Sequence, residues 1–163
     1  MTRFFASVGV ALLLSAALVL PVSAGDQRPV RGQFHGSGVD IAQRCPDALT
    51  IGFAIEGTLS HLGRMTGSGS NCTEFTLGMG AVPIWDGIAS VTAADGSTLN
   101  LAYEGQQGAP ANGVASFFHS DTVVGGTGRF AGATGRLTIE GLIDFSGFPE
   151  VKVSGAVSGW ISY

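Results

Sequence analysis

The stretch that decides the fold is VGGTGRFAGATGR, residues 124–136. It contains the G-x-G-x-x-[G/A] spacing of a dinucleotide-binding loop, at Gly126, Gly128 and Ala131. Such a loop must follow a strand and open a helix, because the helix N-terminus holds the pyrophosphate. The alternating sequence RLTIEGLIDF begins at Arg136, so no room remains for a crossover helix. The stretch therefore predicts a tight, glycine-rich connection between two strands, with one helical turn in which Phe130 is an apolar plug.

Apolar residues recur at every second position on both sides of this stretch, as in β-strands. No segment keeps a 3.6-residue period for three turns, and Asp95-Gly96 is a strong hairpin-turn signal. The pattern predicts eight strands, near residues 30–37, 49–60, 62–70, 84–94, 97–106, 115–124, 134–146 and 150–162. Eight antiparallel strands can close into a barrel whose interior is filled by side chains or holds one small ligand. We therefore predict an all-β, eight-stranded antiparallel barrel; an open sandwich has the same periodicity.

Residues 1–24 have the organisation of a secretory signal peptide. Arg3 is followed by an uncharged apolar run at 8–20 and by the small residues that precede Gly25. The run is shorter than the roughly 20 residues that a helix needs to cross a bilayer. We predict cleavage after Ala24, a single barrel domain over 25–163, and secreted or periplasmic localisation without membrane attachment. An uncleaved N-terminal membrane anchor is the alternative.

The charge pattern argues against nucleic acid as a partner. Without Arg3, 7 Lys and Arg stand against 12 Asp and Glu, and the basic residues are scattered singly. The histidines are far apart and none has a second metal ligand at a known spacing: His35, His61 and His119. The G-x-S-x-G and H-E-x-x-H motifs are absent. The sequence predicts no metal and no cofactor.

Both cysteines, Cys45 and Cys72, lie in the exported part, where a pair is normally oxidised. Each has a loop-like sequence context, on either side of a segment with the pattern of a hairpin. We predict a Cys45–Cys72 disulfide that ties the open ends of that hairpin together. Closing such a loop stabilises the fold by roughly 3 to 4 kcal/mol in the chain-entropy model. A reactive thiol is the alternative.

The segment GGTGRFAGATG, residues 125–135, resembles the signature of the allene oxide cyclase barrel-like proteins, which include the plant dirigent proteins. The segment GTLSHLGRMTG, residues 57–67, is similar to an upstream HLG element of bacterial secreted members, and Asp95-Gly96 matches a third recurring piece. The family-like positions are His61, Leu62, Gly63, Gly126, Thr127, Gly128, Arg129, Phe130, Gly132 and Gly135. The resemblance spans about residues 50–146 and implies an eight-stranded antiparallel barrel. The plant proteins act on an oxylipin epoxide or guide the coupling of phenolic radicals, but no functional residue carries over to this chain.

His119 and Asp121 are the one pair that suggests acid–base chemistry. They are two residues apart on a predicted strand and share a face, so the carboxylate could orient the imidazole. An inward face would make them an acid–base element in a cavity, and an outward face a solvated polar surface. We expect the outward face. For His61 and Arg129 we expect a structural role, bonding loop carbonyls at the barrel mouth.

These features predict an exported small barrel that is a non-catalytic binding or structural module. A small apolar molecule is the expected ligand if the interior is open. Two alternatives remain: an isomerase- or cyclase-like enzyme that uses the same cavity on a small hydrophobic substrate, and an oligomeric protein-interaction module. In the second case the partner is another copy of the chain.

Overall fold

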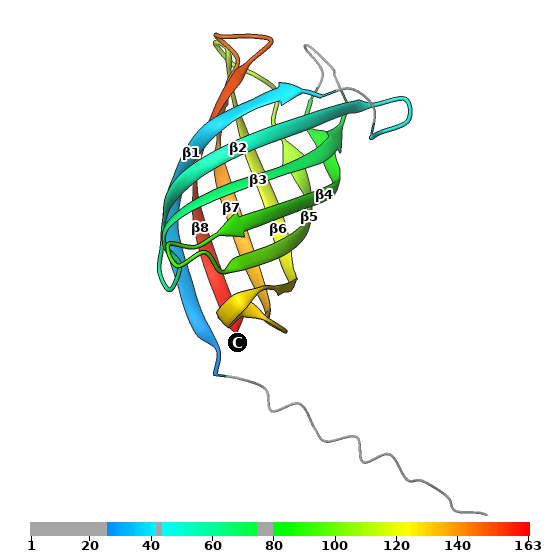
Figure 1. Cartoon of the computed structure of the whole chain (residues 1–163). Helices are drawn as coiled ribbons and strands as arrows, with labels where there is room; N and C mark the ends of the chain where they lie inside the picture. Colours follow the sequence, from blue (N-terminus) through cyan, green and yellow to red (C-terminus); the bar gives the residue numbers. More distant parts are fainter. Residues whose placement is uncertain (1–25, 42–43, 75–79) are drawn as a thin grey trace, which may run out of the picture.

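The computed structural model describes residues 26–41, 44–74 and 80–163, and the predicted signal peptide lies outside them. Eight antiparallel strands form one closed barrel in which each strand pairs with its sequence neighbours and the last pairs with the first (Figure 1). The strands are β1 (Arg28–Asp40), β2 (Leu49–Leu59), β3 (Gly63–Thr73), β4 (Val82–Thr92), β5 (Thr98–Gln107), β6 (Val114–Gly126), β7 (Thr134–Asp144) and β8 (Val151–Ser162). The predicted barrel is confirmed and the open sandwich is wrong. In the described part of the chain, no helix is long and apolar enough to cross a bilayer.

Side chains alternate between the barrel interior and the solvent along each strand, because the side-chain period of a strand is two. In β8, Val157 and Ile161 are buried, whereas Lys152 and Ser158 are exposed. β1 is longer than its predicted range because residues 38–40 continue the ladder with β2. The alternation read from the sequence therefore places the core inside the barrel.

The two ends of the barrel differ. The connections β2–β3, β4–β5 and β6–β7 lie at one end, together with the start of β1 and the end of β8 (Figure 1). Fully buried side chains fill this end: Phe130, Leu62, Met65, Leu99, Ile161 and Val30. We call it the closed end. The opposite end, reached by the connections β1–β2, β3–β4, β5–β6 and β7–β8, is the open end.

The glycine-rich stretch forms the β6–β7 corner at the closed end, with a single 3-10 turn, η1 (Gly128–Phe130). Phe130 is 0% exposed and packs edge-on against Tyr163, with ring centroids 4.8 Å apart. Gly128 has φ +58°, and a Cβ there would lie 2.4 Å from Ser97 Oγ. Glycine is needed because the turn is left-handed at this residue and the β4–β5 connection lies against it. The corner is a plug and contains no nucleotide-binding helix.

The disulfide joins Cys45, just before β2, to Cys72 near the end of β3, with a Cα–Cα distance of 5.7 Å. It ties the open ends of the β2–β3 hairpin together, as predicted from the sequence. Cys72 lies within a strand, paired with Thr50, and the loop predicted there is wrong. The Thr50 hydroxyl accepts hydrogen bonds from the backbone N–H groups of Arg44 and Cys45. The segment that enters β2 is therefore held against the barrel wall at the open end.

Candidate functional site

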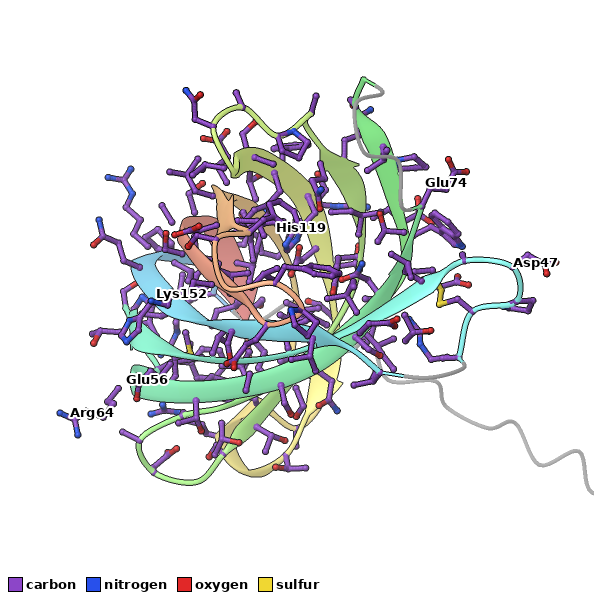
Figure 2. The ribbon with its side chains drawn as sticks, turned by 90° about the horizontal axis from the view of Figure 1, so that it is seen from above. Asp47, Glu56, Arg64, Glu74, His119 and Lys152 are labelled. Atoms are coloured by element: carbon purple, nitrogen blue, oxygen red, sulfur yellow. A yellow bond between two sulfur atoms is a disulfide. The ribbon has the colours of Figure 1, made fainter. Side chains whose placement is uncertain are left out.

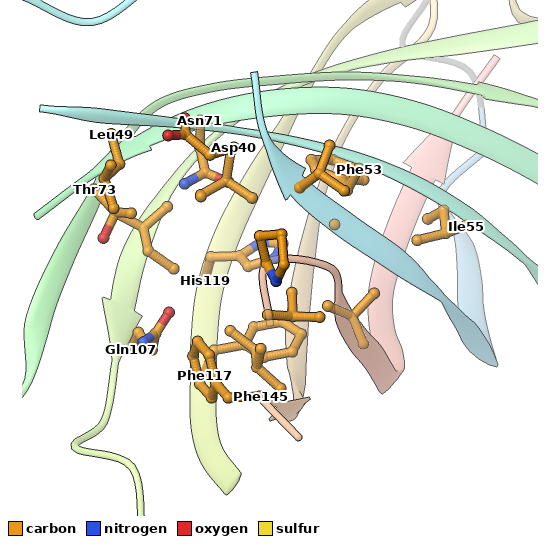
Figure 3. A pocket seen from close by; sticks show the side chains of 18 of the residues that line it. Asp40, Leu49, Phe53, Ile55, Asn71, Thr73, Gln107, Phe117, His119 and Phe145 are labelled. Atoms are coloured by element: carbon orange, nitrogen blue, oxygen red, sulfur yellow. The ribbon is translucent and has the colours of Figure 1, made fainter. Parts of the chain in front are cut away.

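A cavity of about 320 Å³ occupies the open half of the barrel. Its lining is mostly apolar and comes from strands all around the barrel (Figure 3). The aromatic rings that line it are Phe34, Phe53, Tyr103, Phe117, Phe145 and Phe148. Aliphatic side chains fill the spaces between them: Val39, Leu49, Ile51, Ile55, Ile84, Ile143, Val151 and Val153. A cavity of this size and character suits a small apolar molecule.

His119 points from β6 into this cavity (Figure 3). Seen from above, it lies within the ring of strands, whereas Glu56, Arg64 and Lys152 project outward (Figure 2). Its Nδ1 lies 2.5 Å from Oδ1 of Asp121, and the two side chains are 13% and 2% exposed. The expected solvated polar face is therefore wrong. The sequence could not decide it, because Phe117 and Val123 share this face while Phe118 and Val124 share the other.

The hydrogen bond to Asp121 determines which nitrogen of a neutral His119 ring carries the proton. An ionised carboxylate only accepts hydrogen bonds, so the proton of a neutral imidazole sits on Nδ1. The other nitrogen, Nε2, lies on the ring edge away from Asp121 and carries a lone pair. No hydrogen bond to Nε2 is found among the described residues. The pair thus presents a hydrogen-bond acceptor, or a general base, to the cavity.

Neighbouring rings fix the orientation of His119. Its ring stacks against Tyr103 and Phe117, with centroid distances of 4.5 Å and 5.5 Å. Gly105 pairs with His119 across β5 and β6, and a Cβ on Gly105 would lie 2.5 Å from the His119 Cβ. The close approach of these strands leaves room for the imidazole only because Gly105 has no side chain.

Tyr103 and Asn71 form a second polar pair beside the dyad. The Tyr103 hydroxyl donates to Asn71 Oδ1 at 3.1 Å, and Asn71 Nδ2 donates to the Cys72 carbonyl at 3.3 Å. Burial raises the pKa of the Tyr103 hydroxyl well above its usual value, and the negative charge of Asp121 adds to this effect. Tyr103 is therefore a neutral hydrogen-bond donor at physiological pH.

A smaller cavity of about 60 Å³ lies deeper in the barrel, between this polar layer and the plug of the closed end. Tyr103 and His119 line both cavities, whereas Asp121 lines only the inner one. His119 therefore stands at the boundary, with its carboxylate partner on the side away from the open end. This arrangement keeps Asp121 out of contact with a ligand in the larger cavity.

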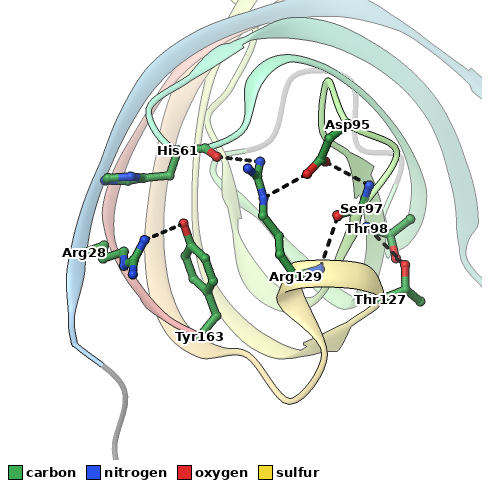
Figure 4. A network of polar contacts seen from close by, with 8 residues as sticks. All are labelled: Arg28, His61, Asp95, Ser97, Thr98, Thr127, Arg129 and Tyr163. Carbon is green, nitrogen blue, oxygen red and sulfur yellow. Dashed lines mark hydrogen bonds and ion pairs between the residues drawn. The ribbon is translucent and has the colours of Figure 1, made fainter.

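The family-like motif residues belong to the β2–β3 and β6–β7 connections and the strand ends beside them, and none of them lines the larger cavity. Figure 4 shows His61, Thr127 and Arg129 at this closed end. The Arg129 guanidinium donates to the His61 carbonyl at 2.7 Å and lies 3.4 Å from a carboxylate oxygen of Asp95. Hydrogen bonds from the backbone N–H and then the side chain of Ser97, followed by the charge of Arg129, hold the pKa of Asp95 below its usual value. The expected bond to a loop carbonyl is thus made by Arg129, and it lies at the closed end and not at the mouth. His61 contributes its carbonyl, with φ +66°.

The sequence did not indicate that Asn71 and Tyr103 are parts of the site. Tyr103 continues the alternation of Leu99 and Leu101 in the sequence, and this alternation indicates a core residue but not a polar contact. Asn71 lies at a bulge, where the β3–β4 register shifts between Ser70 and Cys72. The bulge breaks the two-residue period and buries four successive residues, so periodicity could not place Asn71 inside. Within the described ranges, no group of three or more potential metal ligands is found.

Comparison with solved structures tests the fold. The chain is similar to the pterocarpan synthase dirigent protein GePTS1, with a TM-score of 0.51 and 17% sequence identity over 97% of this chain and 99% of that chain. The fold is a dirigent-like barrel. At this identity the likeness establishes the architecture alone. No family model and no curated protein sequence matches the chain. The likeness therefore assigns no activity to this dirigent-like barrel.

Proposed function

We propose that this protein is an exported dirigent-like barrel that binds a small apolar molecule without transforming it. The observation that carries the proposal is the cavity of about 320 Å³ at the open end, with its aromatic and aliphatic lining. Burying apolar ligand surface against such a lining supplies the binding free energy, at about 25 cal/mol per Å². The Cys45–Cys72 disulfide is typical of an oxidising compartment, which supports export.

Native mass spectrometry of the protein purified from its own host tests the binding proposal. We expect one small molecule per barrel, retained under gentle ionisation and lost on unfolding. Titration with an apolar fluorophore such as 2-methoxynaphthalene measures binding in parallel. A barrel that retains no added mass and leaves the fluorophore unbound contradicts the proposal.

N-terminal sequencing of the same preparation tests export. We expect the mature chain to begin at Gly25, because the signal peptide is predicted to be cleaved after Ala24. A chain that retains residues 1–24 contradicts the predicted cleavage and supports the N-terminal anchor.

A second candidate function is an isomerase- or cyclase-like enzyme with His119 as its general base. The contact between His119 and Asp121 favours it, because a carboxylate that orients an imidazole leaves Nε2 able to accept a proton from a substrate. Chromatography of the molecules released from wild-type and His119→Phe barrels separates the two functions. A binding module yields the same molecule from both, whereas an enzyme yields the isomeric product only from the wild type.

A further inference from the structure

We infer that the ligand of the cavity is an apolar molecule with one uncharged O–H or N–H donor, which bonds Nε2 of His119. Carboxylate ligands are disfavoured. This inference rests on the proposed binding function and adds the chemical class of the ligand. Two observations support it: the unpaired acceptor Nε2 of His119 beside the cavity, and the negative charges of the carboxylates around the cavity.

The acceptor follows from the geometry of the dyad. His119 Nδ1 is committed to Asp121, and Nε2 lies at the opposite ring edge on a side chain that lines the cavity. An acceptor facing an apolar cavity loses its bond to water when a ligand displaces that water. A ligand with no donor leaves this nitrogen unpaired. A ligand with one donor restores the hydrogen bond, so the cavity discriminates in its favour.

The neighbouring polar groups are already paired with the protein. The Tyr103 hydroxyl donates to Asn71, Asn71 donates to the Cys72 carbonyl, and the Thr73 hydroxyl donates to the Pro83 carbonyl. A ligand therefore meets one unpaired acceptor beside the dyad. The other polar side chains of the lining, Asp40, Glu74 and Gln107, lie at strand ends at the mouth of the cavity. This asymmetry favours a molecule with a single donor at one end of an apolar body.

The charges disfavour an anion. Asp121 is a buried carboxylate directly behind His119, and Asp40 and Glu74 line the cavity at its mouth. Among the described residues that line the cavity there is no Lys or Arg. The nearby guanidinium of Arg44 donates to the backbone carbonyls of Ser70 and Asp86. A carboxylate ligand would lose its hydration and find no cation among the described lining residues to compensate, which costs more than a single hydrogen bond returns.

Three probes with the same ring system test the inference on the full mature barrel. They are 2-naphthylmethanol, its methyl ether and 2-naphthoate, with binding measured by fluorescence titration or calorimetry at about pH 7. We expect the alcohol to bind about tenfold more tightly than the ether, the equivalent of one hydrogen bond. Naphthoate should bind more weakly than the ether. Equal binding of alcohol and ether, or tightest binding of naphthoate, overturns the inference and leaves the proposed function intact. Failure of all three probes to bind overturns the proposed function and the inference with it.

The variant His119→Phe assigns the effect to Nε2. The phenyl ring keeps the stacking on Tyr103 and Phe117 but has no acceptor. We expect the alcohol-to-ether ratio to fall to within about twofold, while the ether itself still binds. The matched control is His35→Phe on the outer face, which should keep the tenfold ratio. A ratio that survives in His119→Phe overturns the assignment. If this variant does not fold, the wild-type comparison of the three probes still decides the inference.

Discussion

His119 and His35 carry the same imidazole, and each contacts a carboxylate, but their surroundings give the two pairs different energies. The His119–Asp121 pair is buried, whereas the side chains of His35 and Glu56 are 70% and 64% exposed. Removing the imidazole leaves the buried Asp121 carboxylate without a hydrogen-bond donor, whereas water replaces the lost contact of an exposed pair.

At the residue scale, we therefore predict that His119→Ala lowers the free energy of unfolding by about 3 kcal/mol, because the buried Asp121 carboxylate loses its hydrogen-bond donor. His35→Ala, the matched control, should change it by less than about 1 kcal/mol. Urea denaturation followed by tryptophan fluorescence measures both. Similar values for the two variants would show that the buried pair contributes no more than an exposed one.

Tyr103 gives a prediction for alkaline pH. Burial, and then the charge of Asp121, raise the pKa of its hydroxyl in the folded barrel, so the folded state holds the proton more tightly than the unfolded chain. The resulting stabilisation is fully present below the unfolded pKa of about 10 and is lost as the pH rises above it. The free energy of unfolding should therefore fall above about pH 10 in the wild type and fall less steeply in Tyr103→Phe. Parallel slopes for the two proteins would rule out this role for Tyr103.

At the scale of elements, the β6–β7 corner depends on two left-handed glycines in different surroundings. Gly128 has φ +58° and faces Ser97, whereas Gly132 has φ +75° and open space where a Cβ would lie. A non-glycine residue in this conformation costs roughly 1 to 2 kcal/mol. Any further cost at Gly128 comes from the contact with the β4–β5 connection.

We predict that Gly132→Ala lowers the free energy of unfolding by roughly 1 to 2 kcal/mol, from backbone strain alone. Gly128→Ala should lower it further, because the new methyl group displaces the Ser97 hydroxyl that accepts a hydrogen bond from the Arg129 N–H. Thermal denaturation of the two variants provides the comparison. If Gly132→Ala were the more damaging of the two, the packing of η1 against Ser97 would not be the reason for Gly128.

At the scale of the whole molecule, closure of the sheet turns the alternation along each strand into an inside and an outside. Val153 and Ser154 are adjacent in β8, but Val153 lines the cavity and Ser154 is exposed. We predict that Val153→Trp fills the cavity and weakens binding of 2-methoxynaphthalene by at least about tenfold. Ser154→Trp places the same ring on the outer face and should leave binding unchanged. Fluorescence titration of both variants decides whether the ligand occupies the barrel interior.

Much of the architecture could be predicted from local sequence signals. Alternation in segments such as Val151–Tyr163 predicted the strands, and the absence of room for a helix after Ala131 excluded a nucleotide-binding loop. The disulfide followed from the predicted export of both cysteines, and the Phe130 plug followed from the local sequence. The site was less predictable. Apolar residues occur on both faces of the strand that carries His119 and Asp121, so the pattern did not indicate which face is buried. The bulge at Asn71 breaks the two-residue period of its strand, so the sequence pattern did not indicate that this polar side chain lines the cavity.

The amino-acid order by itself determined the strands, their number and the glycine corner, because these depend on backbone preferences and on neighbours one or two positions away. Only the closed sheet decided which face of β6 is inside, and therefore that His119 and Asp121 form a buried dyad beside Tyr103 and Asn71. It also decided that the core stops short of one end and leaves a cavity. The physical reason is that burial and hydrogen bonding at this site depend on residues brought together from β3, β5 and β6, which lie far apart along the chain.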